Sequence, residues 1–381
     1  MRMDELRVIN FLDSFITNAL SVLIPLLLVA KGVDVVAVGF VVSISPVIFV
    51  VSRSVFAALS DQVGVRRFFV LNGAMNLVAV FIYLIAESPF MFSVGKVFEG
   101  VRNGAIWAVN RTAVVLKKGR EKAAEEMSVV QAIRTGSAAF GIVAAGLLLQ
   151  SYSFDVVLVF FALLSFILFG VSFLTPSSRR MKVKFSRLFE QLDFRSKSDV
   201  LKRTSFVLIF QSVATNVMLS LIFPLFLKEL GYDYWLIGFV IALYYLVSAV
   251  VAFLLSKKGV ISLFVYMWLG AFLFFFGAVA TPFLGGVWAI PFILLMGAGD
   301  GTSTPVWELL VFNSVRNKKD VSSDIALVHT PPNLSNSVGI ILAGLLVKWV
   351  GYWVVFVLCG ILFLLFAYLS SKLLRGVGSD Y

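Results

Sequence analysis

The stretch LSVLIPLLLVAKGVDVVAVGFV (residues 20–41) occurs a second time, with changes, as LSLIFPLFLKELGYDYWLIGFV (residues 219–240). A constant shift of 199 residues aligns ten identical positions, among them Pro25, Gly32, Asp34 and Gly39. Residues 137–159 match residues 335–357 in the same way at a shift of 198. Matches of leucine and valine are common between apolar segments, whereas matches of proline, glycine and aspartate are rare. The sequence therefore predicts an internal duplication.

Long apolar runs surround both copies and divide evenly between them. A helix needs roughly 20 apolar residues to cross a bilayer. Runs of that length fall near 9–29, 35–57, 68–86, 90–112, 127–149, 154–174, 205–227, 234–255, 260–281, 287–313, 325–347 and 351–372. We predict an all-α membrane protein of twelve transmembrane helices in two pseudo-symmetric six-helix bundles, residues 1–175 and 205–381, joined by a cytoplasmic linker loop at 176–204.

The composition excludes a soluble globular chain. Of 381 residues, 60% are hydrophobic and 14% are charged, whereas soluble proteins carry about 25% charged residues. The net charge of +11 does not indicate a nucleic-acid partner, because Lys and Arg are concentrated in short loops between the apolar runs. The single cysteine, Cys359, excludes an intrachain disulfide. The first apolar run lacks a cleavage site and is expected to remain as a helix.

The distribution of Lys and Arg predicts the orientation in the membrane. Segments on the side of the N-terminus carry 24 of these residues, and segments on the other side carry three. Both termini are therefore expected in the cytoplasm of a multi-pass plasma-membrane protein. The two copies contain the same even number of spans and so have the same orientation. Parallel repeats predict a pseudo-two-fold axis along the membrane normal, with a substrate site between the halves near the bilayer midplane.

The loop between the second and third runs reads AALSDQVGVRR (residues 57–67). It resembles the signature loop of the major facilitator superfamily, a Gly-x-Leu-Ala-Asp-Arg-x-Gly-Arg-Lys string, although Ala57 replaces the Gly and Gln62 replaces a cation. The resemblance implies a cytoplasmic latch in which the carboxylate contacts the positive end of a helix and the glycine allows a tight turn. Alternatively, the arginines serve only topology. The expected latch residues are Asp61, Gly64, Arg66, Arg67 and Arg111.

The duplication and this loop together resemble the major facilitator superfamily over the whole chain. That resemblance implies a secondary-active transporter that works by alternating access, and not an enzyme. Drug/proton antiporters of the superfamily carry a Gly-Pro pair in the fifth span, but Ile142 stands at the proline position here, so export is not established by this motif. The sequence contains no nucleotide-binding loop, so we do not expect ATP to drive transport.

Polar and ionisable residues inside the apolar runs are the candidate site, because such groups are costly in a bilayer unless they are paired or hydrated. We predict no catalytic residue, no cofactor and no metal site. The predicted substrate and proton pathway comprises Asp13, Thr17, Lys96, Glu99, Arg102, Asn103, Arg134, Gln211, Asn216, Asp300, Trp307 and Glu308.

The fourth run carries the most charge. Lys96, Glu99 and Arg102 share a helical arc that suits a wet cavity, while Gly100 and Gly104 lie beside it and favour close helix packing. The Lys96–Gly100 segment is also similar to an Arg-x-x-Gln-Gly element of the superfamily. Alternatively, Lys96 and Glu99 form a structural ion pair one turn apart.

The first and seventh runs carry corresponding polar groups. Asp13 is either a proton-coupling group or a fixed counter-ion to Arg102. Gln211 and Asn216 supply neutral hydrogen-bonding groups in the seventh run. His329, the only histidine, precedes Pro331 and Pro332 at an expected kink and is interpreted as a structural or gating residue, with a proton relay as the alternative.

The tenth run reads GAGDGTSTPVWE (residues 297–308). Asp300, Thr304, Trp307 and Glu308 share one helical face, and the glycines with Pro305 predict a broken helix that exposes backbone groups to a ligand. The Gly-x-Gly-Asp string also matches intramembrane aspartyl proteases. That chemistry requires a second carboxylate close by, and residues 232–233, the Tyr-Asp pair that would supply it, fall in an outer loop.

The expected partners are a small-molecule substrate, protons and the lipid bilayer, without nucleic acid, and we expect a monomer. Two substrate hypotheses remain. The aromatic-rich runs with Asp300 and Glu308 favour proton-driven efflux of drug-like or metabolite compounds. Lys96 and Arg102 favour proton-coupled transport of an organic anion.

Overall fold

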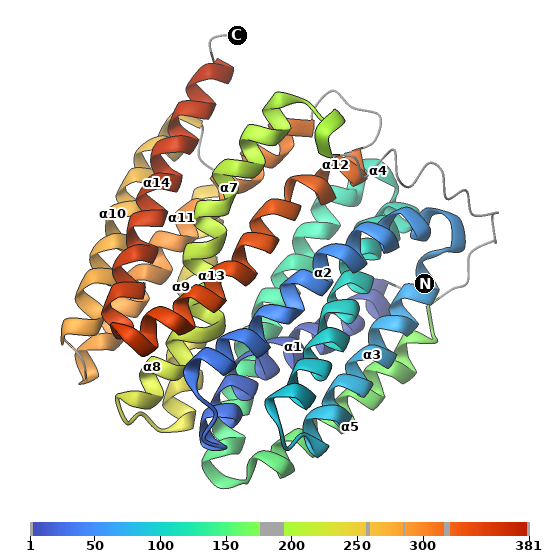
Figure 1. Ribbon diagram of the computed structural model, residues 1–381. Helices are drawn as coiled ribbons and strands as arrows, with labels where there is room; N and C mark the ends of the chain where they lie inside the picture. Colours follow the sequence, from blue (N-terminus) through green and yellow to red (C-terminus); the bar gives the residue numbers. More distant parts are fainter. Residues whose placement is uncertain (1–2, 176–193, 257–259, 285, 316–320, 379–381) are drawn as a thin grey trace. The chain divides into compact units, whose positions relative to one another are not determined.

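The computed structural model describes residues 3–175, 194–256, 260–284, 286–315 and 321–378 (Figure 1). These segments are almost entirely helical and contain no β-strand. Nine helices within them are long and apolar enough to cross a membrane. The predicted all-α membrane architecture is confirmed. Some side chains inside the helices, including those of Asp61 and Arg111, lie outside the described residues.

The chain divides into two compact units. The first unit comprises Met1–Val33 and Val41–Leu192, and the second comprises Asp34–Phe40 and Asp193–Tyr381. The short segment Asp34–Phe40 groups with the second unit because Gly39 lies against the backbone of Ile340 and Gly344.

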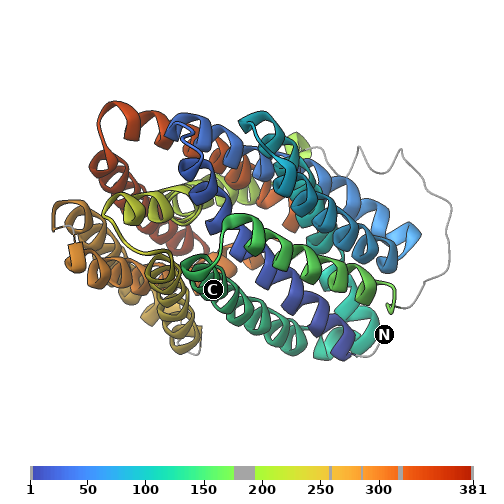
Figure 2. The same ribbon diagram turned by 90° about the horizontal axis from the view of Figure 1, so that it is seen from below.

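The first unit is a bundle built around α4 and α5. Its helices are α1 (Met3–Ala30), α2 (Val35–Val63, of which the part from Val41 onward belongs to this unit), α3 (Val65–Ile85), α4 (Pro89–Ser151) and α5 (Phe154–Ser172). Both α1 and α3 pack against α4 and α5, and Figure 2 shows α1 (dark blue) beside α5 (green). As predicted, Gly100 and Gly104 allow close packing: a Cβ atom at either position would come within 2.5 Å of Ile48 or Ser52 of α2.

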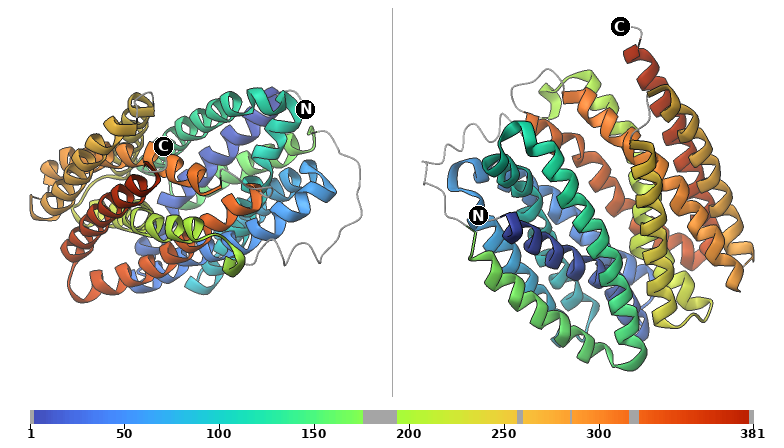
Figure 3. Two further views of the ribbon diagram at one scale, coloured as in Figure 1. Left: turned by 90° about the horizontal axis from the view of Figure 1, so that it is seen from above. Right: turned by 180° about the vertical axis from the view of Figure 1, so that it is seen from behind.

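Helix α4 covers two predicted spans, 90–112 and 127–149, without an assigned break. The side chain of Asn10 nevertheless bonds both Asn110, at 3.1 Å and 2.8 Å, and Arg134, at 2.9 Å. In a straight α-helix, Asn110 and Arg134 would lie roughly 36 Å apart. The chain therefore folds back on itself between these residues, and the reversal is visible in the teal helix of Figure 3. Two antiparallel arms follow, one for each predicted span.

The second unit repeats the same packing scheme. Its helices α10 and α7 both pack against α14, while α10 also packs against α11 and α7 against α13. This matches the packing of α3 and α1 in the first unit, as expected for a duplication. The elements are the 3-10 turn Phe194–Ser196, α7 (Asp199–Val217), the π-helix Met218–Ile222, α8 (Phe223–Glu229), α9 (Tyr234–Ser256), α10 (Val260–Leu284), the 3-10 turn Gly286–Trp288, α11 (Ala289–Val315), α12 (Val321–Val328), α13 (Thr330–Trp349) and α14 (Tyr352–Gly378).

The predicted break in the tenth span is wrong, since α11 runs continuously through Pro305. Its glycines serve packing instead: a Cβ atom on Gly299 would come within 2.8 Å of Phe274 on α10, and one on Gly301 within 2.8 Å of Val251 on α9. The irregular backbone lies in the seventh span, where the π-helix precedes Pro224. Proline lacks an N–H and its ring clashes with the preceding turn, which a wide turn relieves.

The predicted kink in the eleventh span is confirmed. Helix α12 ends at Val328, and α13 begins at Thr330 with two prolines in its first turn. His329 stands at the junction as the N-cap residue of α13.

Candidate functional site

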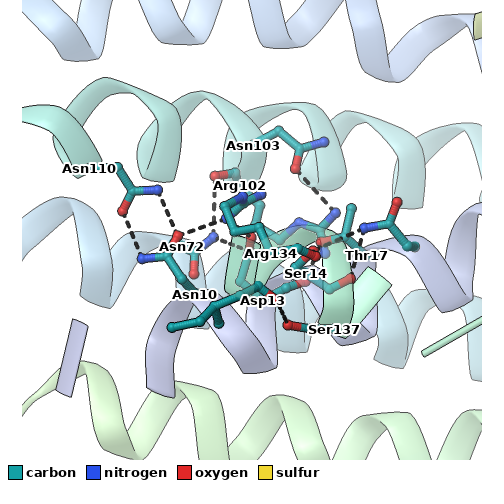
Figure 4. A network of polar contacts seen from close by, with 12 residues as sticks. Asn10, Asp13, Ser14, Thr17, Asn72, Arg102, Asn103, Asn110, Arg134 and Ser137 are labelled. Atoms are coloured by element: carbon teal, nitrogen blue, oxygen red, sulfur yellow. Dashed lines mark hydrogen bonds and ion pairs between the residues drawn. The ribbon is translucent and has the colours of Figure 1, made fainter. Parts of the chain in front are cut away.

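A buried ion pair joins α1 to α4 in the first unit (Figure 4). Asp13, which is 0% exposed, lies 3.0 Å from Nη1 of Arg134 and accepts a hydrogen bond of 2.8 Å from Asn72 Nδ2 on α3. One of the two alternatives for Asp13, a counter-ion role to Arg102, is therefore corrected, because the reversal of α4 brings Arg134 rather than Arg102 to this carboxylate. The guanidinium of Arg134 also stacks on Trp107, 4.8 Å from the ring centre.

Arg102 is held by amide oxygens alone. It is 0% exposed, and it donates to Asn76 Oδ1 at 2.5 Å and to Asn103 Oδ1 at 3.4 Å. Within the described part of the chain, no Asp or Glu lies within 4 Å of it. Asn76 in turn donates to Ser165 at 2.9 Å. The positive charge of Arg102 is thus stabilised by a chain of neutral hydrogen-bonding groups in the interior of the unit.

Of the two interpretations of Lys96 and Glu99, the structure contains the alternative one, an ion pair one turn apart. Their side chains meet at 2.8 Å, and the Tyr83 hydroxyl donates to Glu99 at 2.8 Å. Both charged residues are buried. In this structure Lys96, Glu99 and Arg102 are all buried in the interior of the first unit. Thr17, another predicted pathway residue, is half-buried and donates to the Asp13 backbone at 2.5 Å.

The predicted latch is only partly described. Gly64 has a φ of 84° and precedes α3, which is the left-handed turn that its position in the loop predicts. Arg66 is half-buried and Arg67 is exposed. The contacts of the Asp61 and Arg111 side chains lie outside the described residues, so the latch stays a prediction.

In the second unit, the carboxylate of Asp300 is surrounded by neutral donors. Oδ1 accepts from Gln211 Nε2 at 3.1 Å and from Ser303 Oγ at 3.4 Å, and Oδ2 accepts from Ser248 Oγ at 3.2 Å. Among the residues that the structure describes, no Lys, Arg or His lies within 4 Å of Asp300. The second unit thus contains a carboxylate without the cationic partner that Asp13 has.

A pocket of about 290 Å³ opens beside this carboxylate. It is lined by Gln211, Ser212, Thr215, Asn216, Thr304, Trp307, His329, Pro332 and Asn333. The lining supplies amides, hydroxyls and two aromatic rings, and it includes no Asp, Glu, Lys or Arg. Gln211, Asn216 and Trp307 were expected at the site from the sequence. Glu308 is exposed and is not part of this lining.

Hydrogen bonds fix the rings of Trp307 and His329 in the pocket wall. His329 Nδ1 lies 2.7 Å from the carbonyl oxygen of Ile325, and Trp307 Nε1 donates to His329 Nε2 at 3.3 Å. Indole N–H is only a donor, so Nε2 accepts and Nδ1 carries the proton. These bonds require a neutral imidazole and fit the structural role predicted for His329.

The sequence analysis missed several polar partners of the site. They are Asn72, Asn76 and Tyr83 on α3, Ser248 on α9, Ser303 on α11 and Asn333 on α13. A signal existed for the first two, because two asparagines one turn apart in an apolar helix share a face. The serines gave no comparable signal. In the described part of the chain, no cluster of three or more His, Cys, Asp or Glu side chains could hold a metal ion.

One comparison with known proteins gives the family, and another gives solved structures with a similar fold. The family model described as Major Facilitator Superfamily matches residues 7–323. The solved structure of the nucleoside transporter NupG has a TM-score of 0.73 at 13% identity, with 98% of this chain and 100% of that chain covered. The D-xylose-proton symporter has a TM-score of 0.75 at 13% identity, with 97% and 96% covered. The inward-open xylose transporter XylE from E. coli has a TM-score of 0.73 at 13% identity, with 97% and 95% covered. No curated protein sequence matches the chain.

Proposed function

Because this chain belongs to the major facilitator superfamily, we propose that it is a secondary-active transporter that couples movement of a small uncharged polar solute to protons. Family and fold place it among transporters and not among enzymes, so the intramembrane protease hypothesis is set aside. Its multi-pass membrane character follows from the same family and from its apolar helices.

The chemistry of the pocket carries the proposal. Its lining offers amide and hydroxyl groups that can donate and accept, together with the flat face of Trp307, but no charged side chain. Binding sites place a few polar groups against apolar or aromatic surface to orient a ligand. An anion in this pocket would lack a counter-charge, which is unfavourable in a poorly hydrated site. A neutral solute with hydroxyl groups and one apolar face fits best, and the names of the nucleoside and D-xylose transporters support this class.

Asp300 is the proposed proton-coupling group. An ionised carboxylate at membrane depth is costly without a cation or water, and the described neighbours of Asp300 are neutral hydrogen-bond donors. Binding of a proton removes that charge. Asp13 is less suited to this role, because Arg134 and Asn72 both stabilise its ionised form.

The remaining features of the proposal rest on the sequence. The asymmetry of Lys and Arg supports cytoplasmic termini in the plasma membrane. The parallel repeats support alternating access, with a monomer as the working unit. The site between the halves and the direction of transport stay predictions.

Uptake into proteoliposomes with and without an imposed pH gradient tests the proposal. We expect the gradient to drive accumulation of a neutral solute, with D-xylose and uridine as first probes, and not of succinate or a lipophilic cation. Replacing Trp307 by Ala should lower uptake about tenfold, the equivalent of ~1.4 kcal/mol, whereas Trp349→Ala at an exposed position should change it little. Gradient-driven uptake of succinate that is lost in Arg102→Gln would instead establish organic-anion transport. Accumulation of the lipophilic cation alone would establish the efflux hypothesis.

A further inference from the structure

Gln211 of α7 lies between the pocket and the Asp300 carboxylate. Its side chain lines the pocket. Its amide nitrogen donates to Asp300 Oδ1 and to Ser303 Oγ, both at 3.1 Å. This one side chain therefore contacts both the carboxylate and the pocket.

The directions of these hydrogen bonds belong to an ionised Asp300. An ionised carboxylate can only accept, and here it accepts from Gln211, Ser248 and Ser303. The amide nitrogen of Gln211 must then face Asp300. Its carbonyl oxygen accepts no hydrogen bond from the residues that the structure describes, which leaves that oxygen available to a hydroxyl group of a ligand.

Protonation of Asp300 on Oδ1, the oxygen that faces Gln211, reverses this requirement. A neutral carboxyl group has an O–H donor. When the proton sits on Oδ1, that O–H meets the N–H of Gln211, and two donors face each other. Turning the amide by half a turn replaces this repulsive contact with a hydrogen bond from Asp300 to the Gln211 carbonyl. The turned amide then offers its N–H donors to the pocket in place of its carbonyl oxygen.

In the described part of the chain, the groups around Asp300 are uncharged, so its own proton determines the orientation of the Gln211 amide. Tyr244 and Tyr245 on α9 are the other titratable side chains that face it. Helix α10 packs against this part of α11 through Gly270 and Phe274, which carry no charge. In the described part of the chain, no basic side chain lies within 4 Å of the carboxylate.

We propose that Gln211 is a positioning residue that reports the protonation state of Asp300 to the pocket by turning its amide group. This inference rests on the proposed proton coupling at Asp300 and adds the physical link between proton and solute. Coupling between two sites is reciprocal, typically about 5–150-fold. A solute that binds one amide orientation more tightly therefore shifts the proton affinity of Asp300 by the same factor.

Infrared difference spectroscopy on the full-length protein in lipid nanodiscs, without added solute, tests this inference independently of what is transported. Spectra across about pH 4 to pH 9 would follow the C=O band of a protonated carboxyl and the amide C=O band of glutamine. We expect both bands to change at one midpoint in the wild type. The carboxyl change should be lost in Asp300→Asn, and the glutamine change should be lost in both Asp300→Asn and Gln211→Met.

Matched variants separate the possible failures. Gln211→Asn keeps an amide but shortens the side chain, so it should keep the carboxyl change and lose the coupled amide change. Ser248→Ala removes a donor to the other oxygen and should move the midpoints of both changes together to higher pH without separating them. A carboxyl change at Asp300 without any change of the Gln211 amide would overturn the inference and leave proton coupling intact. Absence of the Asp300 carboxyl band would overturn both.

Discussion

Corresponding places in the two units hold opposite kinds of chemistry. At the shifts that align the repeats, Asp13 corresponds to Ser212 and Arg134 corresponds to Pro332. In the first unit the two form a buried ion pair. In the second unit their counterparts line the pocket. A carboxylate and a long guanidinium side chain in the first unit correspond to a hydroxyl and a proline ring in the second, and the second unit has a pocket where the first has an ion pair.

The counterpart of Asp300 can also be located in the first unit. Gly104 of α4 packs against Ser52 of α2, and Gly301 of α11 packs against Val251 of α9, which aligns with Ser52. The residues one position earlier are Asn103 and Asp300. A neutral amide in one unit thus corresponds to a carboxylate in the other. In the first unit, most buried charged side chains are paired with other protein groups. In the second unit, the carboxylate and the polar pocket lining remain available to bind a proton and a solute.

Replacing each buried aspartate by asparagine should give the largest difference between the units. Asp13→Asn leaves Arg134 buried without its counter-ion, which costs about 3–5 kcal/mol of unfolding free energy. Asp300→Asn removes a charge with only neutral partners and should cost less than about 1 kcal/mol, because the amide retains hydrogen bonds. Detergent-induced unfolding followed by circular dichroism measures both. Equal losses in the two variants would refute the contrast.

Removing an amide partner in each unit sharpens the same comparison at a smaller scale. Asn76→Ala takes away the acceptor of Arg102, and a hydrogen bond to a charged group contributes about 1.5–3 kcal/mol. Asn336→Ala breaks a neutral bond with Ser212 and should cost about 1 kcal/mol. The same unfolding assay applies. A larger loss for Asn336→Ala would show that the charge of Arg102 is stabilised in another way.

Much of the fold follows from the sequence because membrane helices need long apolar runs and because duplicated helices keep their small packing residues. Gly100 and Gly104 were predicted as packing sites because small residues on one helical face let membrane helices approach closely, and the structure agrees. The break predicted in α11 is wrong for a related reason. In a sequence, glycines that allow close helix packing cannot be distinguished from glycines that end a helix. Close packing depends on the neighbouring helix, which a single segment does not reveal.

The site was harder to predict because its contacts depend on how helices face one another. Arg102 was considered as one possible counter-ion of Asp13, but the reversal within α4 brings Arg134 to it. The pocket residues Gln211 and Trp307 were found from their polarity at helical spacing. Ser248 was missed, because a single serine in an apolar run carries no sign of the carboxylate opposite it.

Transferring the chemistry of the first unit into the second should close the pocket. Pro332→Arg places at the pocket a side chain like that of its counterpart Arg134, and it should lower solute uptake by about tenfold or more, ~1.4 kcal/mol in binding. The first unit accommodates an arginine at this place, so the helix itself is expected to tolerate one. Uptake of D-xylose and uridine into proteoliposomes measures the effect. The control is Pro331→Arg, at a half-exposed position outside the pocket lining. Equal uptake by both variants would contradict the proposal.

The smallest effect is expected where the two sequence repeats are most alike. Asp34 and its counterpart Asp233 both accept the first backbone bond of the following helix, at 3.0 Å. Asp34 also lies 3.3 Å from Lys348 in an exposed ion pair. Lys348→Ala should therefore change the unfolding free energy by no more than about 0.5 kcal/mol, and by less at high salt. Asp34→Ala should cost about 1 kcal/mol, because it also removes the side-chain cap on the backbone N–H of Val36. Asp233→Ala tests the same cap position without this ion pair. A loss for Lys348→Ala as large as that for Asp34→Ala would show that the exposed ion pair, and not the cap, accounts for the stabilisation by Asp34.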